Sequence, residues 1–132
     1  MKKISLFVIV LFSSTLLNGC DYLLNTRSFN VTVYNQDTDK EITCVYVRPA
    51  NSNDLWSRNQ ITDHIPPNSD YTFSILEGDY EFKVISEDYT YSYEMYMNSV
   101  TINSDVRLNF CYSCYKDNNN FKVIKTLKKK NH

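Results

Sequence analysis

Residues Tyr80 to Val84 alternate between apolar and charged side chains, and this period of two restricts the fold more than any other feature of the chain. Successive side chains of a β-strand point to opposite faces, so such a segment buries one face and exposes the other. The same alternation recurs along the chain, rich in β-branched and aromatic residues, and no segment shows a sustained helical period. The predicted strands are 29–34, 42–47, 71–75, 80–84, 89–97, 100–102 and 106–110, with 121–127 as a candidate last edge strand.

Short polar segments separate the predicted strands. The longest of them, 50–60, is polar around Leu55 and Trp56, and Asn53 or Asp54 is expected to cap one helical turn there. The 132 residues allow one domain and hardly more. Six or seven short strands separated by turns therefore predict an all-β fold, a small antiparallel β-sandwich.

The start of the chain has the parts of an export signal. Residues 1–3 are a short positive start, and 4–12 are apolar except for Ser5. This apolar segment is shorter than the roughly 20 residues that a membrane-spanning helix needs. We therefore expect a signal peptide here and no membrane-spanning segment.

The end of this signal resembles the lipobox of bacterial lipoproteins. That motif has a branched apolar residue, a variable residue, a small residue and a cysteine, which here are Leu17, Asn18, Gly19 and Cys20. The resemblance implies a diacylglycerol thioether on Cys20, cleavage between Gly19 and Cys20, and an acylated new amino group that anchors the chain stably in a membrane. It implies a place on the extracytoplasmic face of the bacterial cell envelope, and Asp21 resembles the inner-membrane retention signal of enteric-type bacteria. The alternative is an ordinary signal peptide with a cysteine near its end by chance.

These features divide the chain into a signal peptide at 1–19, a lipidated cysteine and tether at 20–28, a β-sandwich domain at 29–115 and a basic tail at 116–132. Loss of the signal lowers Lys+Arg from 14 to 12 against 15 acidic residues, so the mature chain is acidic. The tail contains five lysines and no acidic residue from position 121 onward. Such a tail could contact anionic lipid headgroups or an acidic partner, although a solvated terminus is the simpler interpretation. Export and the acidic body argue against a nucleic-acid partner.

The body of the chain, roughly 29–110, is also similar to small bacterial envelope domains of unassigned function. The matching motifs are Val45-Tyr46-Val47-Arg48-Pro49, Asp54-Leu55-Trp56, Ile65-Pro66-Pro67-Asn68-Ser69 and Gly78-Asp79-Tyr80-Glu81-Phe82-Lys83-Val84. Ser57 and Asn68 stand where those domains often have glycine. The resemblance implies a β-sandwich and carries no activity.

Three cysteines remain after Cys20, and their number is odd. Cys44 could form a disulfide with Cys111 or Cys114, or the last two could pair within their C-x-x-C motif, since disulfides persist outside the cytoplasm. The same three cysteines with His64 form a less favoured Cys₃His set for zinc. A thiol redox role for the C-x-x-C motif would need its first cysteine at a helix N-terminus, whereas here the motif follows a predicted strand. We therefore expect a structural disulfide and one spare thiol, and we predict no bound metal.

Aromatic and acidic residues suggest two kinds of ligand site. Trp56 with Tyr89, Tyr91 and Tyr93 could stack on a glycan, and Tyr96 lies close by in the sequence, but such tyrosines more often fill the core or a half-buried face. Acidic turns could bind calcium, although none matches an EF-hand loop and solvated carboxylates are the favoured interpretation. The turn carboxylates concerned are Asp37, Asp39 and Glu41, and then Asp70, Asp79, Glu87 and Asp88.

The chain has few residues with which to build a catalytic site. His64 is the only histidine before the last residue, and no HExxH, GxSxG or P-loop pattern is present. We therefore predict a non-enzymatic, cofactor-free structural or adaptor module whose partners are the membrane and another envelope component. The alternatives are a glycan- or peptidoglycan-binding module that uses surface aromatics and a thiol redox protein that uses Cys111 and Cys114.

Overall fold

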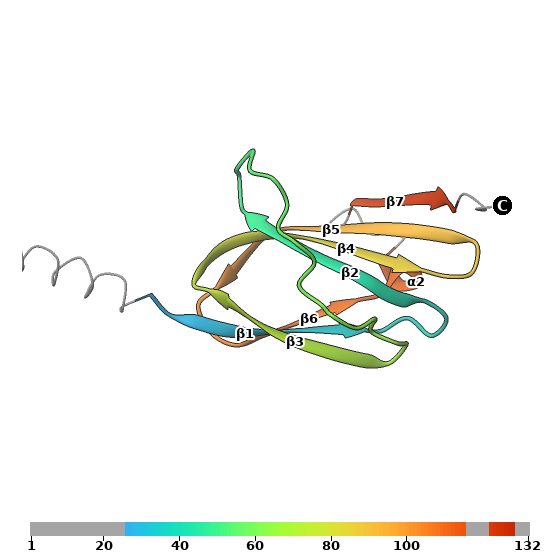
Figure 1. The fold of residues 1–132 in the computed structure, drawn as a ribbon, viewed down its shortest axis with the longest axis horizontal. Coiled ribbons are helices and arrows are strands. Elements are labelled where there is room, and N and C mark those ends of the chain that lie inside the picture. Colours follow the sequence, from blue (N-terminus) through green and yellow to red (C-terminus); the bar gives the residue numbers. More distant parts are fainter. Residues whose placement is uncertain (1–25, 116–121, 129–132) are drawn as a thin grey trace, which may run out of the picture.

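The computed structural model describes residues 26–115 and 122–128, which form two β-sheets packed face to face (Figure 1). The predicted signal peptide 1–19, Cys20 and most of the tether 20–28 lie outside the described residues. The elements in chain order are β1 (Ser28–Asn35), β2 (Glu41–Pro49), β3 (Ser69–Leu76), β4 (Gly78–Glu87), β5 (Tyr91–Ile102), β6 (Val106–Phe110), the short helix α2 (Tyr112–Tyr115) and β7 (Lys122–Leu127).

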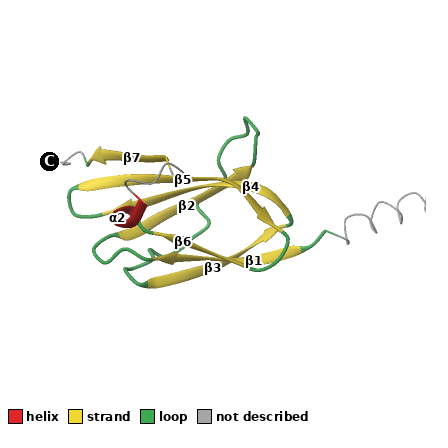
Figure 2. Ribbon diagram, turned by 180° about the vertical axis from the view of Figure 1, so that it is seen from behind, coloured by secondary structure: helices red, strands yellow, loops and turns green. Residues whose placement is uncertain are grey.

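The two sheets contain three and four strands. The smaller, sheet A, has the order β3-β1-β6, and the larger, sheet B, has the order β2-β4-β5-β7. Figure 2 shows the two layers from behind, with α2 at their edge. The predicted all-β sandwich is confirmed, and all its strand pairs are antiparallel except β1 and β6, which run parallel.

The core lies between the sheets and follows the alternation of the strands. On β4, Phe82 and Val84 are fully buried, whereas the alternate residues Glu81 and Lys83 face outward and are only half buried. Each inward side chain removes apolar surface from water, and this burial is the main force that holds the two sheets together. The other buried apolar residues on the strands include Val31, Val33, Val45, Val47, Met95, Ile102, Leu108 and Phe110.

One strand replaces the two that were predicted at 89–97 and 100–102. β5 is continuous from Tyr91 to Ile102, and its pairing with β4 shifts by one residue next to Ser99, whose φ is 54°. An extra residue on one strand of an antiparallel pair is a β-bulge, which bends the strand without ending it. Tyr89 lies in the turn before β5, so the predicted strand start was two residues too early.

The segment after β2 contains no helical turn, so the cap predicted at Asn53 or Asp54 is wrong. Instead, the chain from 57 to 65 runs along the free edge of β2. The N–H groups of Ser57 and Gln60 donate to the carbonyls of Val47 and Val45 at 2.9 and 2.8 Å. An unpaired strand edge is a template for aggregation, and here backbone hydrogen bonds close it.

The last described strand, β7, pairs antiparallel with β5 at the other edge of sheet B. It covers the segment that the sequence suggested as a candidate edge strand. Of the five tail lysines, Lys122, Lys125 and Lys128 are described, whereas Lys129 and Lys130 lie outside the described residues. Within the described ranges, no helix is long and apolar enough to cross a membrane.

Candidate functional site

The two ends of the sandwich differ. β1 begins at one end, and the β1–β2 turn, the β4–β5 turn and the end of β7 gather at the other (Figure 1). A hollow of about 270 Å³ lies at this second end, and we call it the end pocket. Its lining residues are Asp39, Glu41, Thr43, His64, Glu87, Asp88, Tyr89 and Lys128.

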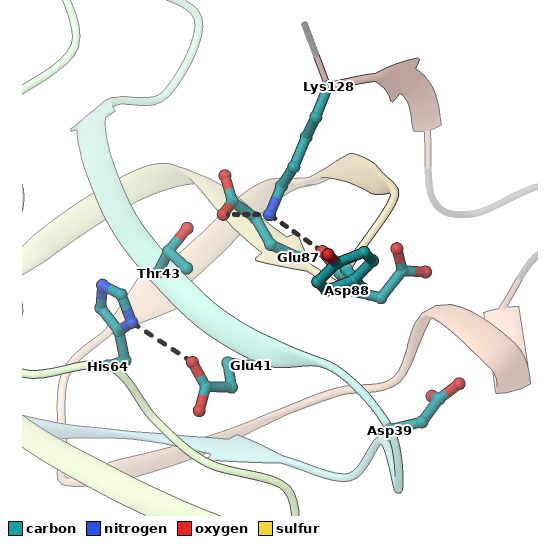
Figure 3. A pocket seen from close by; sticks show the side chains of 8 residues that line it. Asp39, Glu41, Thr43, His64, Glu87, Asp88 and Lys128 are labelled. Atoms are coloured by element: carbon teal, nitrogen blue, oxygen red, sulfur yellow. Dashed lines mark hydrogen bonds and ion pairs between the residues drawn. The ribbon is translucent and has the colours of Figure 1, made fainter. Parts of the chain in front are cut away.

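Ion pairs already engage the two basic groups of the end pocket (Figure 3). The Lys128 Nζ lies 2.8 Å from the Glu87 carboxylate and donates to the backbone carbonyl of Asp88 at 2.9 Å. The His64 Nδ1 lies 3.3 Å from the Glu41 carboxylate, and both of these side chains are exposed. The pocket therefore has an excess of carboxylates and is open to water.

The structure separates the acidic turns that the sequence grouped as calcium candidates. Asp39, Glu41, Glu87 and Asp88 surround the end pocket. By contrast, Asp37 is buried beneath α2, Asp70 pairs with Arg107 at 3.5 Å, and Asp79 accepts a hydrogen bond from Thr101 at 2.6 Å. Among the described residues, no three histidine, cysteine, aspartate or glutamate side chains are arranged as a metal-ligand set.

Asp88 organises the β4–β5 turn. Its carboxylate accepts hydrogen bonds from the backbone N–H groups of Thr90 at 2.8 Å and Tyr91 at 2.7 Å, and from the Tyr93 hydroxyl at 2.6 Å. Burial by itself would raise the pKa of Asp88, but these hydrogen bonds and the positive charge of Lys40 lower it from 3.8 to about 2. The turn is therefore held by the ionised carboxylate.

We expect this turn to weaken the fold in acid. Because the pKa of Asp88 is about 2 in the folded chain and about 3.9 when unfolded, its stabilising contribution is complete above pH 5 and is lost as the pH falls toward 2. The free energy of unfolding of the wild type and of Asp88→Asn, measured by urea denaturation at several pH values, should differ above pH 5 and converge toward pH 2. A difference that stays constant from pH 5 to pH 2 would contradict the assignment.

A buried lysine lies under the same end of the molecule. Lys40 is 5% exposed, and its Nζ contacts Asp39 at 2.7 Å while lying 5.3 and 5.5 Å from the ring centres of Tyr93 and Tyr112. The two rings pack 4.2 Å apart. Burial and the neighbouring carboxylate of Asp88 raise the pKa of the Tyr93 hydroxyl. This cluster is part of the core and supports the turns around the end pocket.

The tyrosines suggested for glycan stacking are not brought together as a platform with Trp56. Tyr93 is 3% exposed and belongs to the core, and Tyr91 lies under Lys125, whose Nζ is 3.8 Å from the ring centre. Tyr89 is fully exposed in the turn beside the end pocket. Trp56 contacts residues on the outer face of sheet B, away from all three.

The cysteines are arranged in one of the ways left open by the sequence. Cys111 and Cys114 form a disulfide with their Cα atoms 5.2 Å apart, and Cys44 is a free, half-buried thiol on the outer face of sheet B. Cys44 therefore pairs with neither of the other two. The zinc set is not assembled, since His64 lies at the end pocket.

The disulfide joins Cys111, the single residue between β6 and the short helix α2, to Cys114 within α2. Cys111 is 2% exposed, whereas Cys114 is exposed. The Asp37 carboxylate accepts hydrogen bonds from the backbone N–H groups of Tyr112 at 2.9 Å and Ser113 at 3.2 Å. Asp37, which is only 2% exposed, thus satisfies the free donors at the start of α2.

The outer face of sheet B presents a second set of aromatic residues that the sequence did not single out as a group. We call it the aromatic–cation face and define it by Tyr46, Arg48, Trp56, Lys83, Tyr96 and Lys122. The strand register aligns four of them in one row, with Tyr46 opposite Lys83, Lys83 opposite Tyr96, and Tyr96 opposite Lys122. Alternation on each strand could have placed these residues on the outer face, but their alignment depends on the strand order.

Trp56 lies over this row. Its ring centre is 4.4 Å from the Arg48 guanidinium, 5.1 Å from the Lys83 ammonium and 6.1 Å from the ring centre of Tyr96. Burial and a hydrogen bond to Glu94 raise the pKa of the Tyr96 hydroxyl to about 12. A hydrogen bond with Cys44, followed by burial, raises the pKa of the Tyr46 hydroxyl. Both hydroxyls are therefore neutral, and the positive charge of the face comes from its Arg and Lys side chains.

Comparison with known protein families, with curated proteins and with solved structures found no match to this chain. The class that the described residues define is a small all-β sandwich.

Proposed function

We propose that this protein is a lipoprotein anchored through Cys20 to the extracytoplasmic side of the bacterial cell envelope, where its β-sandwich acts as a non-enzymatic interaction module. The observation that carries the proposal is the succession of a basic start, a short apolar segment and Leu17-Asn18-Gly19-Cys20. Acyl chains on one cysteine give stable anchoring, since each buried CH₂ group contributes roughly 0.8 kcal/mol.

The point at which the described chain enters the domain is compatible with this proposal. β1 begins at Ser28, eight residues after Cys20, so an extended tether would reach about 25–30 Å. β1 enters the sandwich at the end opposite the end pocket (Figure 1). A tether at this position would leave the end pocket directed away from the membrane and the outer face of sheet B accessible from the side.

The surroundings of the reactive groups support a non-enzymatic role. Cys111 lies directly before α2, the position that a redox role needs, but its side chain is 2% exposed and lies 3.7 Å from the Asp37 carboxylate, so an outside thiol has little access to its sulfur. His64 is an exposed side chain whose contact is Glu41. We therefore favour an adaptor over the thiol redox alternative.

Membrane fractionation of a bacterial host that makes the full chain tests the anchor. Cys20→Ser should move the protein from the membrane to the soluble fraction and abolish labelling with radioactive palmitate, because the side chain that takes the lipid is missing.

Cys44→Ser is the matched control, since it makes the same cysteine-to-serine change but leaves 17–20 intact. It should remain in the membrane fraction and keep its label. Unchanged palmitate labelling of Cys20→Ser would overturn the lipoprotein proposal.

A further inference from the structure

We propose that the aromatic–cation face of sheet B binds an acidic polysaccharide, one that carries a carboxylate on every second sugar. This inference rests on the proposed function, because it names the partner of the interaction module. The aromatic rings of this face are Trp56, Tyr46 and Tyr96. Tyr89, Tyr91 and Tyr93 are not part of it.

Three aromatic rings gather on the solvent side of a sheet. The outward side chains of a half-buried sheet are usually polar. Here Tyr46 and Tyr96 project from β2 and β5 on the side opposite to the buried Val45 and Met95, and Trp56 packs beside Tyr96. The Lys83 ammonium lies near both the Tyr46 and the Trp56 rings. All three are half buried, so part of each ring system remains accessible to water. Such rings offer apolar surface on which the C–H faces of sugars stack.

The backbone next to Trp56 is fixed by hydrogen bonds to β2. Ser57 donates its N–H to the Val47 carbonyl, and its Oγ accepts a hydrogen bond from the Val47 N–H at 3.0 Å. On the sheet side, the Arg48 guanidinium lies against the ring and is held in turn by Glu81 at 2.5 Å. A site whose rings are already ordered loses less conformational entropy when a ligand binds.

Two of the three cations on the face are available for an anionic ligand. Arg48 is paired with Glu81, but among residues 26–115 and 122–128 neither Lys83 nor Lys122 has a carboxylate within 4.0 Å. The nearby Glu94 carboxylate accepts a hydrogen bond from the Tyr96 hydroxyl at 2.5 Å. Within the part of the chain that the structure describes, the ammonium groups therefore have only aromatic rings as partners and can pair with acidic groups of a ligand.

The strand order sets the spacing of the rings and charges. Tyr46 and Tyr96 are two strands apart in sheet B, as are Lys83 and Lys122. Neighbouring strands lie about 4.8 Å apart, so each pair is separated by roughly 9–10 Å across the sheet. This separation is comparable with the repeat of an extended polysaccharide that has one acid per disaccharide. An acidic peptide could form ion pairs with the lysines but would not provide sugar faces that stack on the aromatic rings.

Binding of the purified full chain in detergent to three polymers tests the proposal. The probes are hyaluronate, which alternates a uronic acid with a neutral sugar, a neutral chitin hexasaccharide, and polyglutamate. We expect binding to hyaluronate only. Trp56→Ala should weaken it at least tenfold, and Lys122→Gln should weaken it about threefold and reduce its dependence on salt.

Two variants serve as matched controls. Lys125→Gln removes the same charge from the same strand, but Lys125 stacks on Tyr91 at 3.8 Å on the other side of the sheet. Tyr89→Ala removes a fully exposed ring at the end pocket. Both should bind hyaluronate as the wild type does, and an unchanged melting temperature would show that Trp56→Ala is folded.

The polysaccharide proposal is overturned by the absence of hyaluronate binding, by equal binding to polyglutamate, or by a folded Trp56→Ala variant with unchanged affinity. None of these measurements depends on the lipid, so a failure here is distinct from a failure of the Cys20→Ser test.

Discussion

Replacing Asn35 with alanine should lower the free energy of unfolding by about 4 kcal/mol. The Asn35 side chain is fully buried, and its amide donates to the backbone carbonyls of Lys40 at 2.7 Å and Ile65 at 2.9 Å. Its Oδ1 accepts a hydrogen bond from the N–H of Asp37 at 3.1 Å. Alanine would leave the carbonyl of Lys40 and the N–H of Asp37 without these partners in a buried place, and each such loss costs about 1–3 kcal/mol. The Ile65 carbonyl would keep the N–H of Ile42 at 3.0 Å.

Urea denaturation of the wild type and of Asn35→Ala measures this effect. Asn30→Ala is the matched control, because Asn30 is an exposed asparagine on the same strand that contacts Ser74 at 3.0 Å. The control should lose less than about 1 kcal/mol. A similar loss for both variants would mean that the buried hydrogen bonds of Asn35 contribute little to stability.

Replacing Asp37 with alanine should cost about 3 kcal/mol. The Asp37 carboxylate accepts hydrogen bonds from the N–H groups of Tyr112 and Ser113 and from the Ser113 hydroxyl at 3.1 Å. Hydrogen bonds to a charged acceptor are the stronger kind, and these attach α2 and its disulfide to the β1–β2 turn. The loss is smaller than for Asn35 because water can reach Ser113, which is exposed.

The measurement is urea denaturation with the Cys111–Cys114 disulfide intact. Asp37→Asn keeps one oxygen acceptor and should lose about half as much stability as Asp37→Ala, since the charge is removed but not the shape. Asp63→Ala removes an exposed carboxylate from the segment that follows β2 and should change stability by less than about 0.5 kcal/mol. An Asp37→Ala variant as stable as Asp63→Ala would rule out this role for Asp37.

Both buried polar residues were missed in the sequence because a turn of polar residues gives no sign of which side chains are inside. Asn35 falls in the polar segment between the predicted strands 29–34 and 42–47, and the sequence groups Asp37 with Asp39 and Glu41 as solvated carboxylates. The Asn-x-Asp spacing at the end of a strand is typical of a local side-chain-to-backbone turn and could have drawn attention to Asn35. The contacts to Ile65 and Tyr112 come from segments far along the chain, which no local pattern reveals.

The predicted aromatic site illustrates the same limit. The period of two correctly groups Tyr91 and Tyr93 on one face, but it does not say whether that face is covered. Tyr112 and Lys40 cover Tyr93, and Lys125 from β7 covers Tyr91. These contacts bury Tyr93 and cover the half-buried Tyr91, so the two rings do not form an open stacking surface.

The sequence by itself determined the all-β class, because apolar and polar side chains alternate with the period of a strand and each strand must bury one face. The pattern at 17–20, on whose resemblance to a lipobox the proposed anchor depends, can likewise be seen in the sequence alone, because such a motif is short and linear. Only the tertiary structure decided that Cys111 pairs with Cys114, that Asp37 is buried, and that Tyr46, Lys83, Tyr96 and Lys122 form one row. These features depend on which strands become neighbours, and strand order is set by packing between segments distant in the chain.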